Sequence, residues 1–193
     1  MGKWSISVAC TIRRGLRKIA ENYDQFSKSV SGSYPKFEPH VTLATFSTLD
    51  PQQLRESIPK SGLSDLRIQF KSVDIGTHFF RSVYIAVEPS SALTALHTHI
   101  HQALNMEPRT PSFPHISLCY IVDDDAARGE RQAWRDQLEA TGRIRSSDNG
   151  VELNCGINVD EDWMACFLAH EIWLVNCVGP VEEWSILDRV LLN

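Results

Sequence analysis

The sequence lacks the segments that would carry it into or across a membrane. It contains no uninterrupted run of about 18 apolar residues, the length that indicates a membrane-spanning helix. The opening segment MGKWSISVAC has too short an apolar stretch for a signal peptide. From these absences we expect a cytoplasmic protein that has no membrane partner.

Positive charge is also scarce. The chain has 19 Lys and Arg against 24 Asp and Glu, which gives a formal net charge of −5. Proteins that bind long nucleic acids use many basic residues to neutralise phosphates, and this composition offers no such excess. We therefore expect no long nucleic acid as a partner, whereas a small anion held by a few local groups is compatible with the composition.

Cysteine is neither abundant nor clustered. The five cysteines are an odd number, no CxxC pair occurs, and each lies alone in an apolar context. This usage is typical of reduced, buried thiols rather than of a disulfide framework or a zinc cluster. The residues concerned are Cys10, Cys119, Cys155, Cys166 and Cys177.

The patterns that are present predict a mixed fold. The chain has 193 residues, of which 42% are hydrophobic, enough for one compact domain or two small lobes that share a cleft. Strands are expected at 4–10, 40–46, 66–76, 82–88, 115–122, 150–159, 163–177 and 181–192. Helices are expected at 11–29, 49–58, 91–105 and 123–140. We predict an α+β fold with two sheet-bearing lobes that face each other.

Two expected strands begin with nearly the same sequence motif. FEPHVTL covers 37–43, and FPHISLCY covers 113–120. A single His in a strand is usually a packing residue, but two copies in equivalent contexts indicate a shared role. Residues i and i+2 of a strand point to one face, so His40 projects with Thr42, and His115 projects with Ser117.

If the two strands meet, two imidazoles and two hydroxyls converge on one pocket. Such a set can donate hydrogen bonds to the oxygens of a phosphate. An imidazole titrates near pH 6.5 when unperturbed, so one His of a pair can accept a proton while the other donates one. This arrangement suits hydrolysis of a phosphodiester, and we expect an enzyme that needs no metal and no other cofactor.

These segments resemble those of the two-histidine (2H) phosphoesterase superfamily, and in particular its small cyclic phosphodiesterases. The segment LVNCVGPVEEWSILDR, at 174–189, is similar to the closing part of the fungal 2′,3′-cyclic nucleotide 3′-phosphodiesterases. The resemblance implies one domain over 1–193, built as two pseudo-symmetric antiparallel-sheet lobes with outer helices around a central cleft. It also implies conversion of 2′,3′-cyclic nucleotides to 2′-phosphates, together with ADP-ribose 1″,2″-cyclic phosphate from tRNA splicing as a further substrate.

Carried over to this chain, the resemblance implies that His40 and His115 are the catalytic pair. It also implies that Thr42 and Ser117 bind the phosphate of the substrate. We assign His115 as the base that activates water and His40 as the acid, although the symmetry of the two motifs leaves the reverse order open. Tyr120 stands where relatives place an aromatic residue, and it is a candidate for contact with the base or ribose. Packing in the core explains Tyr120 equally well.

Two other clusters suggest metals only weakly. His97 and His101 in HTHIH are one helical turn apart, as metal ligands on a helix can be, but an exposed polar helix face is the simpler interpretation. The segment VDDD, at 122–125, stands at the start of an expected helix, where carboxylates are favoured by the helix dipole. His78 and His170 belong to no motif, and we expect packing or surface roles for both.

Two alternative functions remain open at this point. A phosphodiesterase of the same fold could act on RNA ends or 2′,5′-oligonucleotides, which would require a basic track for the strand. A non-catalytic module could use the same histidines only to bind a nucleotide or phosphate. We favour a monomeric enzyme whose partner is a small cyclic-phosphate nucleotide.

Overall fold

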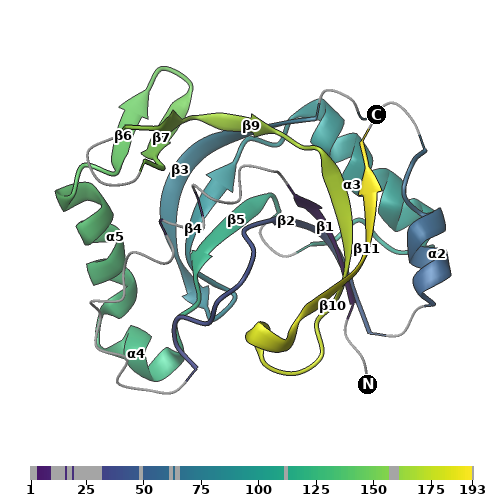
Figure 1. Cartoon of the computed structure of the whole chain (residues 1–193), viewed down its shortest axis with the longest axis horizontal. Helices are drawn as coiled ribbons and strands as arrows, with labels where there is room; N and C mark the ends of the chain where they lie inside the picture. Colours follow the sequence, from purple (N-terminus) through teal and green to yellow (C-terminus); the bar gives the residue numbers. More distant parts are fainter. Residues whose placement is uncertain are drawn as a thin grey trace.

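The computed structural model describes residues 4–9, 16, 19, 32–47, 50–60, 63, 66–110, 113–156 and 161–192. Within this part of the chain, every paired strand runs antiparallel to its neighbour. Figure 1 shows the strands arranged in an arc around the centre of the molecule. The predicted helix at 11–29 lies outside the described residues except for Leu16 and Ile19, which are helical and buried.

The main sheet has eight strands in two sets of four. The first set, in spatial order, is β11 (Ser185–Leu191), β10 (Glu171–Asn176), β1 (Trp4–Ala9) and β2 (Val41–Phe46). The second set is β5 (His115–Cys119), β4 (Arg81–Val87), β3 (Arg67–His78) and β9 (Cys166–Leu168). The two sets are joined where β2 pairs with β5, at Val41 and Ile116. The expected sheet-bearing lobes are therefore parts of one continuous sheet.

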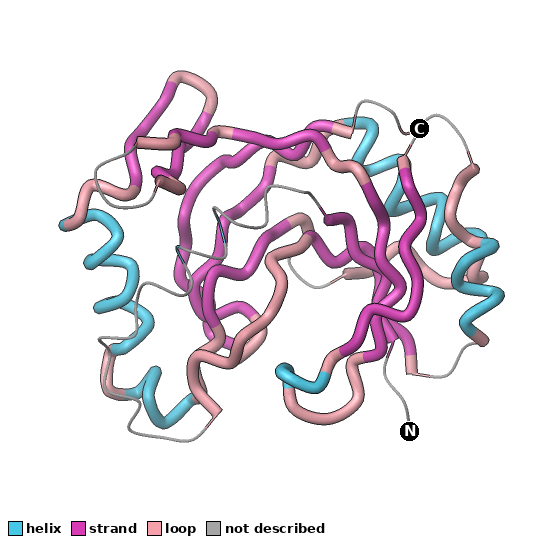
Figure 2. The backbone as a smooth tube through the Cα atoms, viewed as in Figure 1, coloured by secondary structure: helices cyan, strands magenta, loops and turns pink. Residues whose placement is uncertain are grey.

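The remaining elements lie outside this sheet. A second, three-stranded sheet contains β6 (Ile144–Ser147), β7 (Gly150–Asn154) and β8 (Trp163–Met164). Apart from the helical Leu16 and Ile19, the helices in the described part of the chain are α2 (Pro51–Glu56), α3 (Ser91–Ala103), α4 (Asp123–Ala127) and α5 (Glu130–Ala140), and a 3-10 turn, η1, covers Val181–Glu183. Figure 2 shows two groups of helices on opposite flanks of the strands. The predicted α+β fold with outer helices is confirmed.

The larger of two hydrophobic clusters in the described residues spans both sets of strands. Apolar side chains of β2, β4 and β5 are fully buried together with those of the inner faces of α3 and α5. On α3 the buried positions recur every three or four residues, which is the period of one helix face. Members of this core include Leu43, Ile85, Leu93, Ile100, Leu118 and Trp134.

Two predicted elements are divided in the structure, and a third ends early. The helix expected at 123–140 breaks at Gly129, whose φ of 86° is left-handed and is readily adopted by glycine. The strand expected at 163–177 forms β8, β9 and β10. The strand expected at 150–159 ends at Asn154 as β7, and 157–160 lie outside the described residues.

Two predictions from composition can be compared with the structure. No helix in the described part of the chain is long and apolar enough to cross a membrane. Cys119 and Cys155 are buried thiols as expected, whereas Cys166 and Cys177 are half-buried, and Cys10 lies outside the described residues. Burial raises the pKa of Cys155 to about 12, so this thiol stays protonated at neutral pH.

Candidate active site

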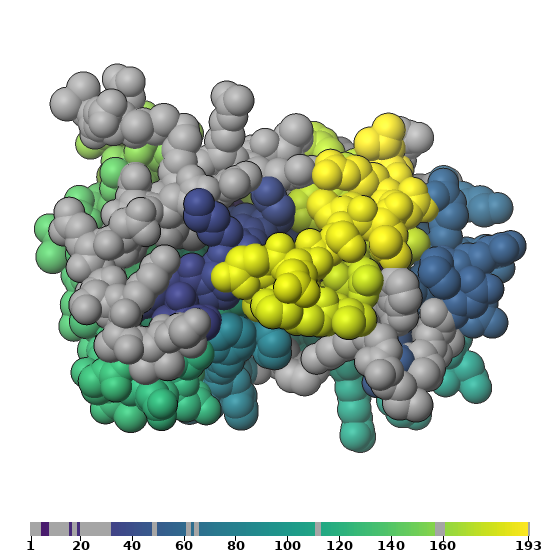
Figure 3. Space-filling view, turned by 60° about the horizontal axis from the view of Figure 1, so that its bottom comes forward, coloured from purple at the N-terminus to yellow at the C-terminus, as the bar shows by residue number. Residues whose placement is uncertain are grey.

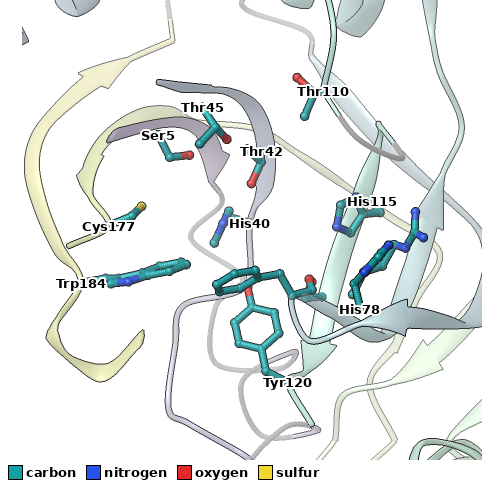
Figure 4. A pocket seen from close by; sticks show the side chains of 13 residues that line it. Ser5, His40, Thr42, Thr45, His78, Thr110, His115, Tyr120, Cys177 and Trp184 are labelled. Carbon is teal, nitrogen blue, oxygen red and sulfur yellow. The ribbon is translucent and has the colours of Figure 1, made fainter. Parts of the chain in front are cut away.

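The two histidine strands lie side by side at the centre of the sheet. Because β2 and β5 are antiparallel and Val41 pairs with Ile116, the register sets His40 opposite Ser117 and Thr42 opposite His115. These four side chains line one cavity of about 420 Å³. Figure 4 shows His40, Thr42 and His115 around its centre. The predicted convergence of both motifs on one pocket is what the structure contains.

His40 is held in a defined orientation. Its Nδ1 lies 2.6 Å from the backbone oxygen of Glu38. Since a carbonyl oxygen can only accept, Nδ1 carries a proton, and Nε2 is the ring nitrogen that can exchange one. Burial lowers the pKa of His40 below its usual value, against the opposing effect of the Glu38 carbonyl. The His40 ring is therefore neutral at pH 7 in the ligand-free protein.

The loop that precedes β2 is tied to Tyr120, just after β5, and to helices α4 and α5. The Ser33 hydroxyl donates to Asp125 at 2.5 Å, and the Tyr34 amide donates to the Tyr120 carbonyl at 2.8 Å. The Tyr34 hydroxyl donates to Glu130 at 2.7 Å. The acidic run begins helix α4, as predicted, and its third carboxylate also anchors this loop. These bonds limit how far the first histidine can move from the second.

The second histidine belongs to β5 itself. His115 pairs with Ala86 of β4, and the Tyr84 ring meets the imidazole edge-to-face with centroids 5.5 Å apart. The Ser117 hydroxyl donates to the Phe80 carbonyl at 2.8 Å. A phosphate bound here would therefore compete with the Phe80 carbonyl for the Ser117 hydroxyl.

Tyr120 lines the cavity but is mostly buried. Its ring stacks on Phe37 at a centroid distance of 4.1 Å and meets Phe80 edge-on at 5.6 Å. Only 3% of the Tyr120 residue is exposed, and burial raises the pKa of its hydroxyl. Packing therefore accounts for most of its surface, and the aromatic residues more open to the cavity are Phe80 and Trp184.

The structure adds lining residues that the sequence analysis did not assign to the site. Thr45 joins the cavity face because β2 has an irregular register opposite Ile6 and Ser7, which interrupts the strict alternation of its side chains. Others come from segments far apart in sequence, so no local spacing could have grouped them. The added residues are Ser5, Thr45, His78, Phe80, Arg81, Thr110, Cys177 and Trp184.

The carboxy-terminal segment forms one wall of the site. Figure 3 shows this segment, in yellow, against the dark blue segment that leads into β2. His40 and Trp184 line the main cavity and also a smaller neighbouring groove of about 160 Å³. The Trp184 ring stacks against Phe80 across the cavity, with centroids 5.7 Å apart. An aromatic pair thus connects the two halves of the molecule at this site.

His97 and His101 of α3 do not lie on an exposed polar face, so that expectation is wrong for both. His97 is 6% exposed and His101 is fully buried. The Thr110 hydroxyl donates to the Leu43 carbonyl at 2.5 Å, so its oxygen accepts from Nε2 of His97 at 2.9 Å. The His97 ring also stacks on Phe113 at 4.1 Å. His97 therefore holds Thr110 in the wall of the cavity.

The burial of His97 predicts an effect of pH on stability. Burial, with a smaller contribution from His101, lowers the pKa of His97 to about 4. The unfolded chain then binds this proton more tightly than the folded protein, so stability falls as pH drops below about 6.5. The variant His97→Gln keeps a donor for Thr110 but has no ring to protonate. Between pH 7.5 and pH 5, we expect its free energy of unfolding to fall by up to about 2 kcal/mol less than that of the wild type.

Urea unfolding at the two pH values measures this difference. The matched control is His99→Gln, which changes an exposed histidine of the same helix and should keep the wild-type dependence. An unchanged pH dependence in His97→Gln would show that this ring does not carry the effect.

The remaining histidines and the candidate metal sites can now be placed. His78 lies at the end of β3 and lines the cavity, so the expectation of a packing or surface role is incomplete. His170 is exposed between β9 and β10. Among the residues that the structure describes, no group of three or more His, Cys, Asp or Glu is arranged to hold a metal ion.

The chain matches one family model and is similar in sequence to proteins from other organisms. A model of the family described as "Cyclic phosphodiesterase-like protein" matches residues 11–192. The 2′,3′-cyclic-nucleotide 3′-phosphodiesterase of Yarrowia lipolytica is 22% identical over 210 residues, which cover 86% of this chain and 91% of that protein. A Saccharomyces cerevisiae protein of the same name is 28% identical over 122 residues, 57% of this chain and 48% of that protein.

A solved structure shows the same fold. The structure of E. coli LigT complexed with 3′-AMP matches with a TM-score of 0.58 and 13% sequence identity, and the match covers 100% of this chain and 98% of that chain. At this level of identity the likeness concerns the fold alone.

Proposed function

The chain belongs to the cyclic phosphodiesterase-like protein family, and from that membership we propose that it hydrolyses 2′,3′-cyclic nucleotides to nucleoside 2′-phosphates. The observation that carries this proposal is the pairing of β2 with β5, which brings two His-x-hydroxyl motifs into one cavity. The names of the relatives from Yarrowia and Saccharomyces support the same reaction. The reaction class is hydrolysis of a phosphoric diester.

In the proposed reaction, His115 takes a proton from water as the water oxygen attacks phosphorus. The bond from phosphorus to the 3′ oxygen breaks, and His40 gives its proton to that oxygen, which leaves a 2′-phosphate. Thr42 and Ser117 donate hydrogen bonds to the non-bridging oxygens, where charge accumulates in the transition state. These steps need only groups that line the cavity.

The environment of His40 suits the role of acid. A buried imidazolium gives up its proton more readily than an exposed one, because burial disfavours the charged form. The negative charge of a bound phosphate opposes this effect and favours protonation of the ring. We infer that His40 takes up its proton when the substrate binds and releases it to the leaving oxygen.

The nucleobase has aromatic surface available to it. Phe80 is 46% exposed at the tip of the β3–β4 hairpin, and Trp184 faces it across the cavity. Stacking on such a ring contributes about 1–3 kcal/mol per base and is tolerant of base identity. We propose that Phe80 and Trp184 contact the base and that Tyr120 holds Phe80 in position by packing against its ring.

The experiment that tests this function is product analysis. Purified protein is incubated with 2′,3′-cyclic AMP in the presence of EDTA, and 2′-AMP is separated from 3′-AMP. We expect 2′-AMP from the wild type and neither product from the His40→Ala, His115→Ala double variant. Formation of 3′-AMP would contradict the proposed direction of opening, and a requirement for added metal would contradict the proposed mechanism.

If 2′,3′-cyclic AMP gives no product, other substrates that this fold could take must be tested. ADP-ribose 1″,2″-cyclic phosphate from tRNA splicing would be tested first, followed by oligonucleotides that end in a cyclic phosphate. If none of these is hydrolysed but 2′-AMP still binds, the protein is a nucleotide-binding module and the proposed enzymatic function is wrong.

A further inference from the structure

The cavity contains an arginine and a third histidine that opening of a cyclic phosphate does not use. His78 ends β3 and Arg81 begins β4, and the two residues pair across the tip of the hairpin. Both line the cavity that holds His40 and His115. In Figure 4, His78 lies on the His115 side of the cavity, away from Trp184. A small substrate with one phosphate would leave this side of the site without a ligand.

Arg81 has no anionic partner in the described part of the chain. Its Nε is buried and makes no hydrogen bond there, and none of the ion pairs among those residues includes it. Its guanidinium carbon lies 5.6 Å from the centroid of the Tyr84 ring, which in turn contacts His115. A buried donor that is left unpaired costs free energy, and a bound anion would remove that cost.

The hairpin that carries Arg81 is held in place from behind. The buried guanidinium of Arg131 donates to Gly76 O at 3.4 Å and to Ser82 Oγ at 3.2 Å, so it bonds one residue on each strand of the hairpin. The fit between the strands is close at Gly76. A Cβ there would lie 2.0 Å from the Arg81 carbonyl oxygen and 3.0 Å from Arg81 Nε. Arg81 is thus oriented before any ligand arrives.

We propose that Arg81 and His78 form a second anion site, which selects substrates that carry another phosphate group beside the cyclic phosphate. A guanidinium presents a planar fork of donors that matches a phosphate, and an imidazole adds one more donor. The main cavity of about 420 Å³ is within the size range of pockets that hold nucleotide-sized ligands. This inference rests on the proposed function, because it names the class of substrate that the same site prefers.

Equilibrium binding of two product analogues tests the second site without any turnover. Isothermal titration calorimetry compares adenosine 2′-phosphate with adenosine 2′,5′-bisphosphate, which differ only in the second phosphate. We expect the wild type to bind the bisphosphate about tenfold to a hundredfold more tightly, the range that charge-assisted hydrogen bonds supply. In Arg81→Gln this ratio should fall close to one, and Arg81→Lys should retain part of it.

Arg145→Gln is the matched control. Arg145 lies on β6 in the three-stranded sheet, where it pairs with Glu152, and it does not line the cavity. This variant should keep the wild-type ratio of affinities. A ratio near one in the wild type, or a ratio that survives in Arg81→Gln, would overturn the second anion site.

Two further ligands identify the source of the second phosphate. A 5′-diphosphate of adenosine 2′-phosphate represents small nucleotides, and the dinucleotide UpA with a terminal 2′-phosphate represents an RNA end. Preference for the former assigns the site to diphosphate-bearing nucleotides, and preference for the latter assigns it to oligonucleotides. If the affinity ratio holds but 2′,3′-cyclic AMP is not hydrolysed, the proposed function fails while the second anion site stands.

Discussion

Replacement of His40 or His115 by alanine is expected to lower kcat for 2′,3′-cyclic AMP by about a thousandfold, within the range that general acid or base groups contribute. Each variant removes one of the two histidines that line the cavity, and with it one of the two proposed proton transfers. The double variant should be only slightly slower than either single one, because groups that act as a unit have non-additive effects. Steady-state kinetics of the purified variants measures these losses.

Binding of the product separates a catalytic role from a purely binding role. The single variants should retain part of the wild-type affinity for 2′-AMP, since Thr42 and Ser117 still face the phosphate. His99→Ala and His170→Ala, which change exposed histidines outside the cavity, should behave like the wild type. If His40→Ala or His115→Ala keeps more than a tenth of the wild-type kcat, the removed residue is not the proposed acid or base.

The second large effect is a bell-shaped dependence of kcat/KM on pH. The reaction needs one neutral imidazole and one charged imidazole, so the rate should fall about tenfold per pH unit on both sides of the optimum. The charged ring in this scheme is His40, whose pKa is lowered by burial. At neutral pH, therefore, only a minority of the free enzyme carries the charged His40 ring that the reaction needs.

The profile of kcat should differ from that of kcat/KM in a defined direction. Bound phosphate favours the imidazolium of His40, so the alkaline limb of kcat should lie at higher pH than that of kcat/KM. Rates are measured from pH 4 to pH 9 at constant ionic strength. Recovery of activity on return to pH 7 controls for unfolding in acid. A flat profile between pH 5 and pH 9 would be incompatible with the two-histidine mechanism.

Most of the secondary structure was predictable because its signals are local. The strands at the two histidine motifs, helix α3 and the helix start at Asp123 follow from side-chain periods and capping over a few residues. The failures also have local causes. Gly129 interrupts a helix whose apolar pattern continues past it, and the run at 163–177 contains two strand breaks that its composition does not mark.

The candidate site was predictable in part, because side chains two residues apart in a strand lie on the same face. The period of two residues in a strand sets His40 beside Thr42 and His115 beside Ser117 without reference to the rest of the chain. The resemblance to a family then supplies the proposed roles. We propose that the two sets of strands are the pseudo-symmetric lobes of one domain over 1–193, as the repeat of the motif suggested.

The sequence by itself therefore determined two His-x-hydroxyl motifs, the proposed catalytic half-sites, and the family of the chain, because both depend on residues a few positions apart. Only the tertiary structure decided that Val41 pairs with Ile116, that His97 is buried behind Thr110 and that Arg81 points into the same cavity. Pairing of distant strands depends on how the whole core packs, and burial depends on neighbours from other elements. Neither quantity is encoded in the spacing of a short segment.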